Sequence, residues 1–86
     1  MIYLEKMHTL QRLHTLIARR GTGSREALAA RLGVSERTVY RLLGALEGLG
    51  ASIAYDQERG TYYYTNRFEL KIHVIVVIDG EEYTII

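Results

Sequence analysis

Three side chains that could bind phosphates or the edges of bases stand close together near the middle of the sequence: Arg37, Tyr40 and Arg41. In a helix, steps of three and four residues bring all three onto one face. Each guanidinium presents a planar set of donors that fits a phosphate or a guanine, and the phenol adds a further polar group. The bland alternative is a solvated helix face with the tyrosine ring lying flat on it.

Two helices joined by a tight turn are predicted to hold this face in place. Residues 24–49 show helical spacing in two short stretches that are interrupted at Gly33. Ala29 is small enough for a steep helix crossing, Gly33 tolerates positive φ, and Val34 fills the gap between the helices. This spacing predicts a helix-turn-helix. A plain αα-hairpin within a helical bundle is the alternative.

Hydroxyl side chains stand where both helices of this unit begin. Ser24 is the expected N-cap of the first, and Ser35 can cap the second by accepting from the N–H of Arg37 or Thr38. The second helix is predicted to run from Glu36 to about residue 49. It is expected to bury Val39, Leu42, Leu43, Leu46 and Leu49.

A preceding helix is predicted over residues 3–20, where apolar residues recur at steps of three and four. Arg19 and Arg20 stand at its end, where cations favour the helix dipole, and Gly21 is expected to supply a left-handed cap. The link over residues 22–24 could add a very short strand to a sheet.

After Gly50 the spacing of apolar residues changes from helical to alternating. Strands are predicted over Ser52–Asp56 and Thr61–Thr65, joined by a hairpin loop that ends in Gly60. A hairpin placed directly after the second helix is the arrangement of a winged helix. Alternation along the second strand sends Tyr63 to one side of the sheet and its two tyrosine neighbours, Tyr62 and Tyr64, to the other.

A second hairpin is predicted at the end of the sequence. Phe68–Ile78 is rich in strand-forming residues, Asp79-Gly80 favours a type I′ turn, and Glu81–Ile86 is the expected return strand. Every residue from Val74 to Ile78 is apolar, so both faces of this strand are expected to be buried. The helical core could cover one face, and a second copy of the chain is expected to cover the other. Cover of both faces within the monomer is the alternative.

Composition excludes several classes of protein. The 86 residues are 48% hydrophobic and 24% charged, which is typical of one small globular domain rather than a disordered chain. Cysteine is absent, so disulfides and cysteine-based zinc sites are excluded, and no leader or membrane segment is apparent. The three histidines lack the spacing of metal ligands, and no phosphate loop or nucleophile motif occurs. We expect a cytoplasmic protein that is not an enzyme and binds no cofactor, metal or small molecule.

Charge is distributed unevenly along the chain, although its net value is only +1. Residues 1–50 hold eight basic and four acidic side chains, and residues 51–86 hold three basic and six acidic ones. Ordinary scatter could produce counts of this size. Seven of the eight basic residues in the first half are arginine, however, which favours recognition of phosphate and guanine.

From about Leu4 to Ile72 the chain resembles the type-11 helix-turn-helix domain. This winged-helix module occurs at the N-terminus of bacterial transcriptional regulators that continue into a WYL sensor domain. The resemblance is carried by AARLGVSERTVYRLLGALEGLGASIAYDQERGTYYY, in which residues 35–41 match the family pattern S-x-R-T-[IV]-Y-R. Leu42 departs from it, because members commonly carry Asp there, and 86 residues leave no room for a WYL domain. The resemblance implies DNA binding without that kind of effector sensing.

These observations predict an α+β fold, with a winged helix-turn-helix over residues 1–67 and a hairpin extension over residues 68–86. The predicted function is a bacterial, sequence-specific transcriptional regulator that binds double-stranded DNA as a homodimer, with the helix after Ser35 in the major groove and the wing on the backbone. The alternative is a winged-helix module for protein interaction, such as an adaptor or anti-repressor. The candidate DNA-binding residues are Arg25, Ser35, Arg37, Thr38, Tyr40, Arg41 and Arg59.

Overall fold

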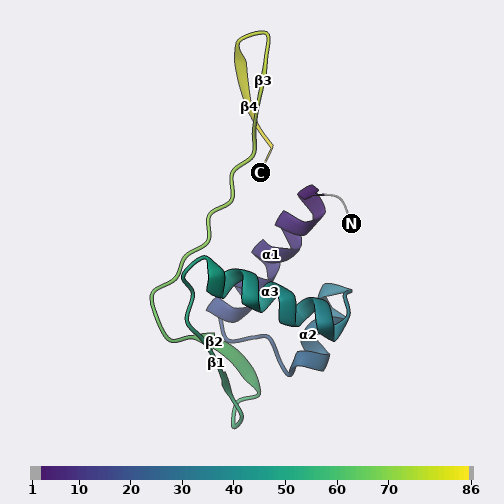
Figure 1. Ribbon diagram of the computed structural model, residues 1–86, viewed down its shortest axis with the longest axis vertical. Coiled ribbons are helices and arrows are strands. Elements are labelled where there is room, and N and C mark those ends of the chain that lie inside the picture. Colours follow the sequence, from purple (N-terminus) through teal and green to yellow (C-terminus); the bar gives the residue numbers. More distant parts are fainter. Residues whose placement is uncertain (1–2, 86) are drawn as a thin grey trace.

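The computed structural model describes residues 3–85, in which three helices precede two separate antiparallel strand pairs (Figure 1). The elements are α1 (Tyr3–Ala18), α2 (Arg25–Leu32), α3 (Glu36–Gly48), β1 (Ile53–Asp56), β2 (Thr61–Tyr64), β3 (Ile75–Ile78) and β4 (Glu81–Thr84). The predicted α+β fold, a winged helix-turn-helix followed by a C-terminal hairpin, is confirmed. The predicted N-terminal domain and last strand also include Met1, Ile2 and Ile86, which lie outside the described residues.

The core forms where the three helices meet, and each helix contributes side chains with no exposed surface. Leu13 and Ile17 come from α1, Leu28 from α2, and Val39 and Leu46 from α3. Their spacing is the helical spacing expected of one buried face per helix. The packing of these faces orients α3 relative to α2.

Leu49 was expected in this core, and that prediction is wrong. The side chain is 60% exposed, because α3 ends at Gly48 and Leu49 forms its C-terminal cap. Leu42 is only partly buried, whereas Leu43 joins the core as predicted. The buried face of α3 is therefore narrower than its apolar pattern indicated.

The left-handed residue at the end of α1 is Arg20, with φ of 55°, and not Gly21 as predicted. Its N–H donates to the carbonyl oxygen of Ile17 (3.0 Å), and the N–H of Gly21 donates to that of Leu16 (2.9 Å). This is the Schellman arrangement, one residue earlier than the position of the glycine. The Arg20 guanidinium lies 5.0 Å from the centre of the Tyr63 ring, a cation–π contact that offsets part of the backbone cost.

The link between α1 and α2 attaches the wing through side chains and forms no strand of its own. The Tyr62 N–H donates to Oγ1 of Thr22 (2.9 Å), and the Thr22 N–H donates to Oγ1 of Thr61 (3.2 Å). Both threonines are buried, so these bonds satisfy backbone groups that water cannot reach. The hydroxyls thus replace the short strand that the link could have added.

The wing is the hairpin of β1 and β2, with Ile53 opposite Tyr64 and Asp56 opposite Thr61. Tyr62 and Tyr64 pack against the core, and Tyr63 lies on the other side beneath Arg20. The predicted alternation of the three tyrosines is confirmed.

The C-terminal hairpin stands away from the helices, at one end of a molecule 53 Å long (Figure 1). Asp79 and Gly80 both have positive φ, 51° and 82°, as the predicted type I′ turn requires. All residues of β3 and β4 are exposed, so the expectation that the helical core covers one face is wrong. Phe68 and Leu70 pack on the core, but the chain then extends without a partner strand, and β3 begins only at Ile75.

His14 joins α1 to the wing and to the segment that leaves the core. Its Nδ1 lies 2.7 Å from the Tyr64 hydroxyl, and its Nε2 accepts from the Leu70 N–H at 3.4 Å. A neutral ring with its proton on Nδ1 satisfies both contacts. Burial lowers the pKa of His14 in spite of the nearby Glu69 carboxylate, and burial raises the pKa of Tyr64 to about 12.

This junction is expected to make stability depend on pH. Because the pKa of His14 is lower in the folded state, the unfolded chain binds the proton more tightly. The free energy of unfolding should therefore be greatest above the ordinary histidine pKa of 6.5 and decrease as pH falls from there toward the folded pKa. Urea unfolding between about pH 5 and 7.5 measures this, and His14→Gln should flatten the slope. The exposed His73→Gln control should keep it, and an unchanged slope in His14→Gln would contradict the assignment.

Candidate nucleic-acid interface

The start of α3 is fixed by two hydroxyl side chains from the candidate set. Ser35 Oγ accepts from the Thr38 N–H (3.1 Å), and the Ser35 hydroxyl donates to Thr38 Oγ1 (3.0 Å). The predicted N-cap is confirmed, with Ser35 in an extended conformation just before the helix. Both hydroxyls therefore have a structural role, which holds the first turn of α3 in a defined orientation.

The turn before α3 has the backbone conformation predicted for Gly33. Its φ of 68° and ψ of 34° are left-handed, and Ser24 caps the start of α2 as expected. The N–H of Val34 donates to the carbonyl oxygen of Ala29 (3.0 Å), and that of Gly33 donates to Ala30 (3.2 Å). These bonds close the end of α2 and set the direction in which α3 begins.

The outer face of α3 carries Arg37, Tyr40 and Arg41, all three exposed. Tyr40 is 70% exposed, while Val39 on the opposite face has no exposed surface. Within residues 3–85, none of the three side chains forms a hydrogen bond or an ion pair. Their donors are thus available to a ligand, on a helix whose own position is fixed by packing.

Arg25 already has a partner at the start of α2. Its Nε lies 3.2 Å from Oε1 of Glu36, and both side chains are about half exposed. The ion pair connects the first turns of α2 and α3. An incoming phosphate would share this guanidinium with the carboxylate.

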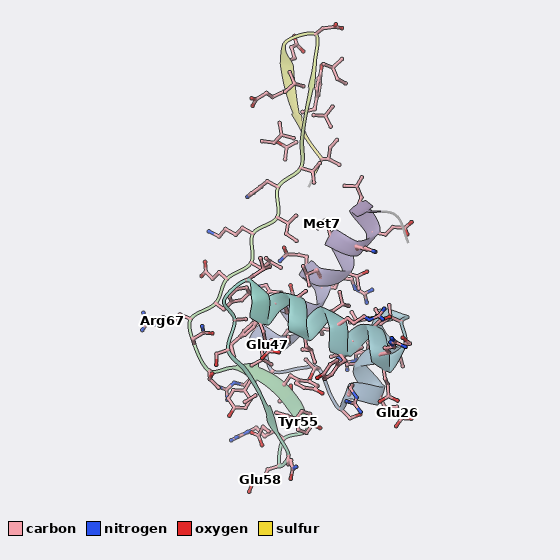
Figure 2. All side chains as sticks on the ribbon, in the orientation of Figure 1. Met7, Glu26, Glu47, Tyr55, Glu58 and Arg67 are labelled. Atoms are coloured by element: carbon pink, nitrogen blue, oxygen red, sulfur yellow. The ribbon has the colours of Figure 1, made fainter. Side chains whose placement is uncertain are left out.

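A groove lies between α3 and the wing, with a volume of about 290 Å³. Arg25 and Tyr40 line it from the helices, and Tyr55 and Tyr62 line it from the wing. Tyr55 and Tyr62 meet edge to face with 4.8 Å between ring centres, and Figure 2 shows Tyr55 on the wing below Glu47 of α3. The sequence did not predict Tyr55 as a residue of this groove, because alternation was considered only for Tyr62, Tyr63 and Tyr64. The register of β1 and β2 places Tyr55 opposite Tyr62.

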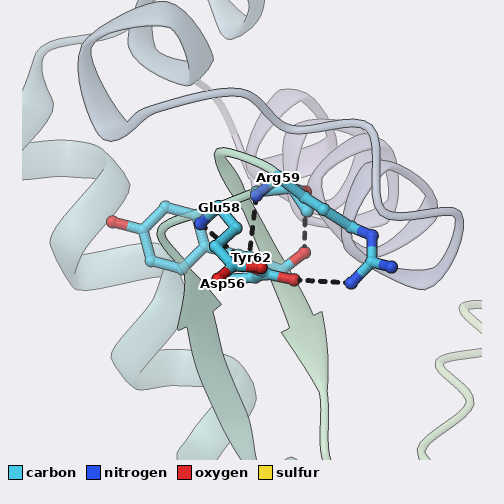
Figure 3. A network of polar contacts seen from close by, with 5 residues as sticks. Asp56, Glu58, Arg59 and Tyr62 are labelled. Atoms are coloured by element: carbon cyan, nitrogen blue, oxygen red, sulfur yellow. Dashed lines mark hydrogen bonds and ion pairs between the residues drawn. The ribbon is translucent and has the colours of Figure 1, made fainter.

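The wing tip is organised around one carboxylate, shown in Figure 3. Asp56 Oδ1 accepts from the N–H groups of Glu58 (3.0 Å) and Arg59 (3.1 Å), and Oδ2 lies 3.2 Å from Nη1 of Arg59. These bonds from Arg59 hold the pKa of Asp56 below its ordinary value. Gly60, with φ of 64°, closes the loop as predicted. The charge of Arg59 is therefore balanced within the wing, and a phosphate would have to compete with Asp56.

A second groove lies beside Arg41, on the side of α3 that faces α1. It is lined by Lys6 and Thr9 of α1 and by Thr38, Arg41 and Leu42 of α3. Lys6 adds a cation next to the candidate face, from a position far away in the sequence. Sequence spacing alone carries no signal for this neighbour, because the two helices meet only in the fold.

A protein-family model described as an HTH domain matches residues 8–64. The chain belongs to this helix-turn-helix family. The resemblance to the type-11 domain is confirmed, and this is a family of DNA-binding domains rather than of enzymes. The match runs from α1 to β2, so the β3–β4 hairpin lies outside it.

No curated protein and no solved structure gave a match to this HTH domain. Among residues 3–85, no helix has both the length and the hydrophobicity that crossing a bilayer demands. In the same part of the chain, no group of three or more histidine or acidic side chains is placed to hold a metal ion.

Proposed function

We propose that this HTH domain acts in the bacterial cytoplasm as a sequence-specific regulator of transcription. One observation carries the proposal: α3 presents Arg37, Tyr40 and Arg41 with their donors free, on a face that nothing else in the described chain covers. A helix of this kind fits the major groove of B-DNA, where guanidinium groups read guanine and the aromatic ring can contact a thymine methyl group or a phosphate.

The remaining candidate residues are proposed to position the domain on the DNA backbone. Ser35 and Thr38 hold the start of α3, where backbone N–H groups and the helix dipole favour a phosphate. Arg25 and Arg59 would contact phosphates at the two ends of the interface, each in competition with its own carboxylate. Lys6 and Tyr55, which line the flanking grooves, extend the proposed contact surface to α1 and to the wing.

Salt dependence of binding tests whether phosphate contacts exist. If about three to five phosphates are neutralised, the logarithm of the affinity for a random duplex should fall against the logarithm of the salt concentration with a slope of about −2.7 to −4.5. Fluorescence anisotropy at several salt concentrations measures the slope. Absence of binding even at low salt would contradict the proposal and favour the protein-interaction module, for which the exposed apolar hairpin is the supporting observation.

Selection of binding sites from genomic fragments then tests sequence specificity. Enrichment of one motif is expected if α3 reads bases, and fragments without a common motif would leave only nonspecific binding. Because the method reports the symmetry of the site, it also bears on the number of copies bound.

We further propose that the protein is a homodimer, with residues 1–67 binding DNA and residues 68–86 joining the two copies. One small domain contacts few base pairs, and two copies on a two-fold site are a common route to useful specificity.

A further inference from the structure

The β3–β4 hairpin is an isolated pair of four-residue strands with apolar side chains on both faces. Ile75, Val77 and Ile78 are each more than half exposed, and Tyr83 on β4 is 48% exposed. A two-stranded hairpin is marginally stable in water unless further strands or a helix cover it. The hairpin therefore needs a partner, and its two edges differ in how well they could accept one.

The two edges of the hairpin carry different side chains. β4 begins with Glu81 and Glu82, so pairing of this edge with its own copy would place charged side chains at the contact. β3 is Ile-Val-Val-Ile and has neither charge nor proline, the features by which native edge strands avoid pairing. The edge better suited to accept another strand is therefore that of β3. A second β3 would bring no charge to this edge.

Hydrogen bonding within the hairpin decides which backbone groups face outward. The Ile85 N–H donates to the carbonyl oxygen of Val74 (2.7 Å), and β3 pairs with β4 in a continuous antiparallel register. Bonded and non-bonded residues alternate along such a strand, so Val76 and Ile78 also bond toward β4. The N–H and C=O groups of Ile75 and Val77 are left to point away from the hairpin.

We infer that β3 pairs antiparallel with β3 of a second copy about a two-fold axis at Val76, forming a four-stranded sheet. This inference rests on the proposed homodimer and specifies its contact. Residues whose N–H and C=O groups point away from one hairpin must lie opposite such residues of the other hairpin. Ile75 therefore lies opposite the partner's Val77, and Val76 lies opposite the partner's Val76. Shifting the strands to the next allowed register in one direction sets Ile75 against the partner's Asp79, and in the other sets His73 against the partner's Val77. The register centred on Val76 alone matches the run Val74–Ile78 with itself.

Cysteine cross-linking tests both the partner and the register, because the natural sequence contains no cysteine. Opposed residues at a non-bonded position are about 4.5 Å apart between Cα atoms, within the range that a disulfide spans. Val76→Cys is therefore expected to form a covalent dimer on mild oxidation. Ile75→Cys and Val77→Cys should each form no disulfide-linked dimer when oxidised alone, because diagonal neighbours lie about 7–8 Å apart. Mixed together, these two proteins should form a mixed disulfide.

A charge substitution gives an independent measurement. Val76→Lys should be monomeric by light scattering at tens of micromolar, since two ammonium groups would meet at the axis, and its helical circular dichroism should match wild type. Glu82→Lys, on the other edge, should remain a dimer. A wild-type chain that is monomeric by light scattering, a Val76→Cys variant that forms no disulfide-linked dimer on oxidation, or equal cross-linking at positions 75 and 76 would overturn the inference. Neither measurement involves DNA, so failure here is distinguishable from failure of DNA binding.

Discussion

Replacing Arg41 by alanine is expected to weaken binding of the selected duplex by about 1–3 kcal/mol, the typical value of a specific contact to a base. The side chain is exposed on the outer face of α3 and forms no hydrogen bond or ion pair within residues 3–85, so its loss removes nothing from the fold. The thermal unfolding midpoint should therefore stay at its wild-type value. Anisotropy titrations with the selected duplex and with a scrambled one separate loss of base recognition from loss of general affinity.

The matched control is Arg67→Ala, which removes the same charge from a different part of the surface. Arg67 is exposed on the segment after the wing, beside Ala18 and Glu69 rather than beside α3. Figure 2 shows it at the opposite side of the molecule from Glu26 of α2. Arg67→Ala should leave the preference for the selected duplex unchanged. Equal effects from the two substitutions would remove Arg41 from the proposed reading face.

Local chemistry explains why much of this fold was predictable from the sequence. Gly33 and Ser35 have requirements that depend only on their neighbours: a left-handed turn and a hydroxyl acceptor for a nearby N–H. The alternation along β2, which places Tyr63 on the other side of the sheet from Tyr62 and Tyr64, also depends only on neighbouring residues. For α3, the helical period separates the exposed Arg37 and Arg41 from the buried Val39 without reference to any tertiary contact.

The errors arose where a residue's environment depends on distant parts of the chain. Arg20 adopts the left-handed conformation although a glycine follows it, and a ring from the wing lies under its guanidinium. The apolar residues of the C-terminal hairpin favour packing on the helices, but pattern alone does not tell which surface a strand reaches. The extended segment that follows Leu70 leads away from the core, so β3 lies far from the helices (Figure 1).

The candidate interface was predictable in its composition but not in its electrostatics. Positions near a helix start and a loop tip favour Arg25 and Arg59 as phosphate contacts. In the fold, Glu36 and Asp56 lie within 3.2 Å of their guanidinium groups, so both charges are partly balanced. This balance was foreseeable only for Arg59, whose acidic neighbours are close to it along the chain. Glu36 is eleven residues from Arg25 and approaches it only because the turn at Gly33 folds α3 back on α2.

Gly33→Val is expected to lower the free energy of unfolding by about 1–3 kcal/mol, the cost of holding a residue with a side chain in a sparsely populated conformation. A β-branched residue is especially poorly tolerated at positive φ. An added Cβ at Gly33 would meet no atom within 4 Å other than those of its two chain neighbours, so the Cβ itself finds open space. Chemical denaturation measures the change, and the loss should appear in the denaturant midpoint with little change in slope.

Two further variants, Gly33→Asn and Gly33→Ala, test whether the loss of stability comes from the backbone conformation at this position or from any replacement of the glycine. Asparagine adopts the left-handed conformation more readily than other residues with a Cβ, so Gly33→Asn should retain most of the wild-type stability. Gly33→Ala should lie between Asn and Val. This order follows from the positive φ at Gly33, because the position of the Cβ, which all three residues share, lies in open space. A Val variant as stable as wild type would mean that the turn tolerates another conformation, and α3 would then lack the fixed orientation on which reading of DNA depends.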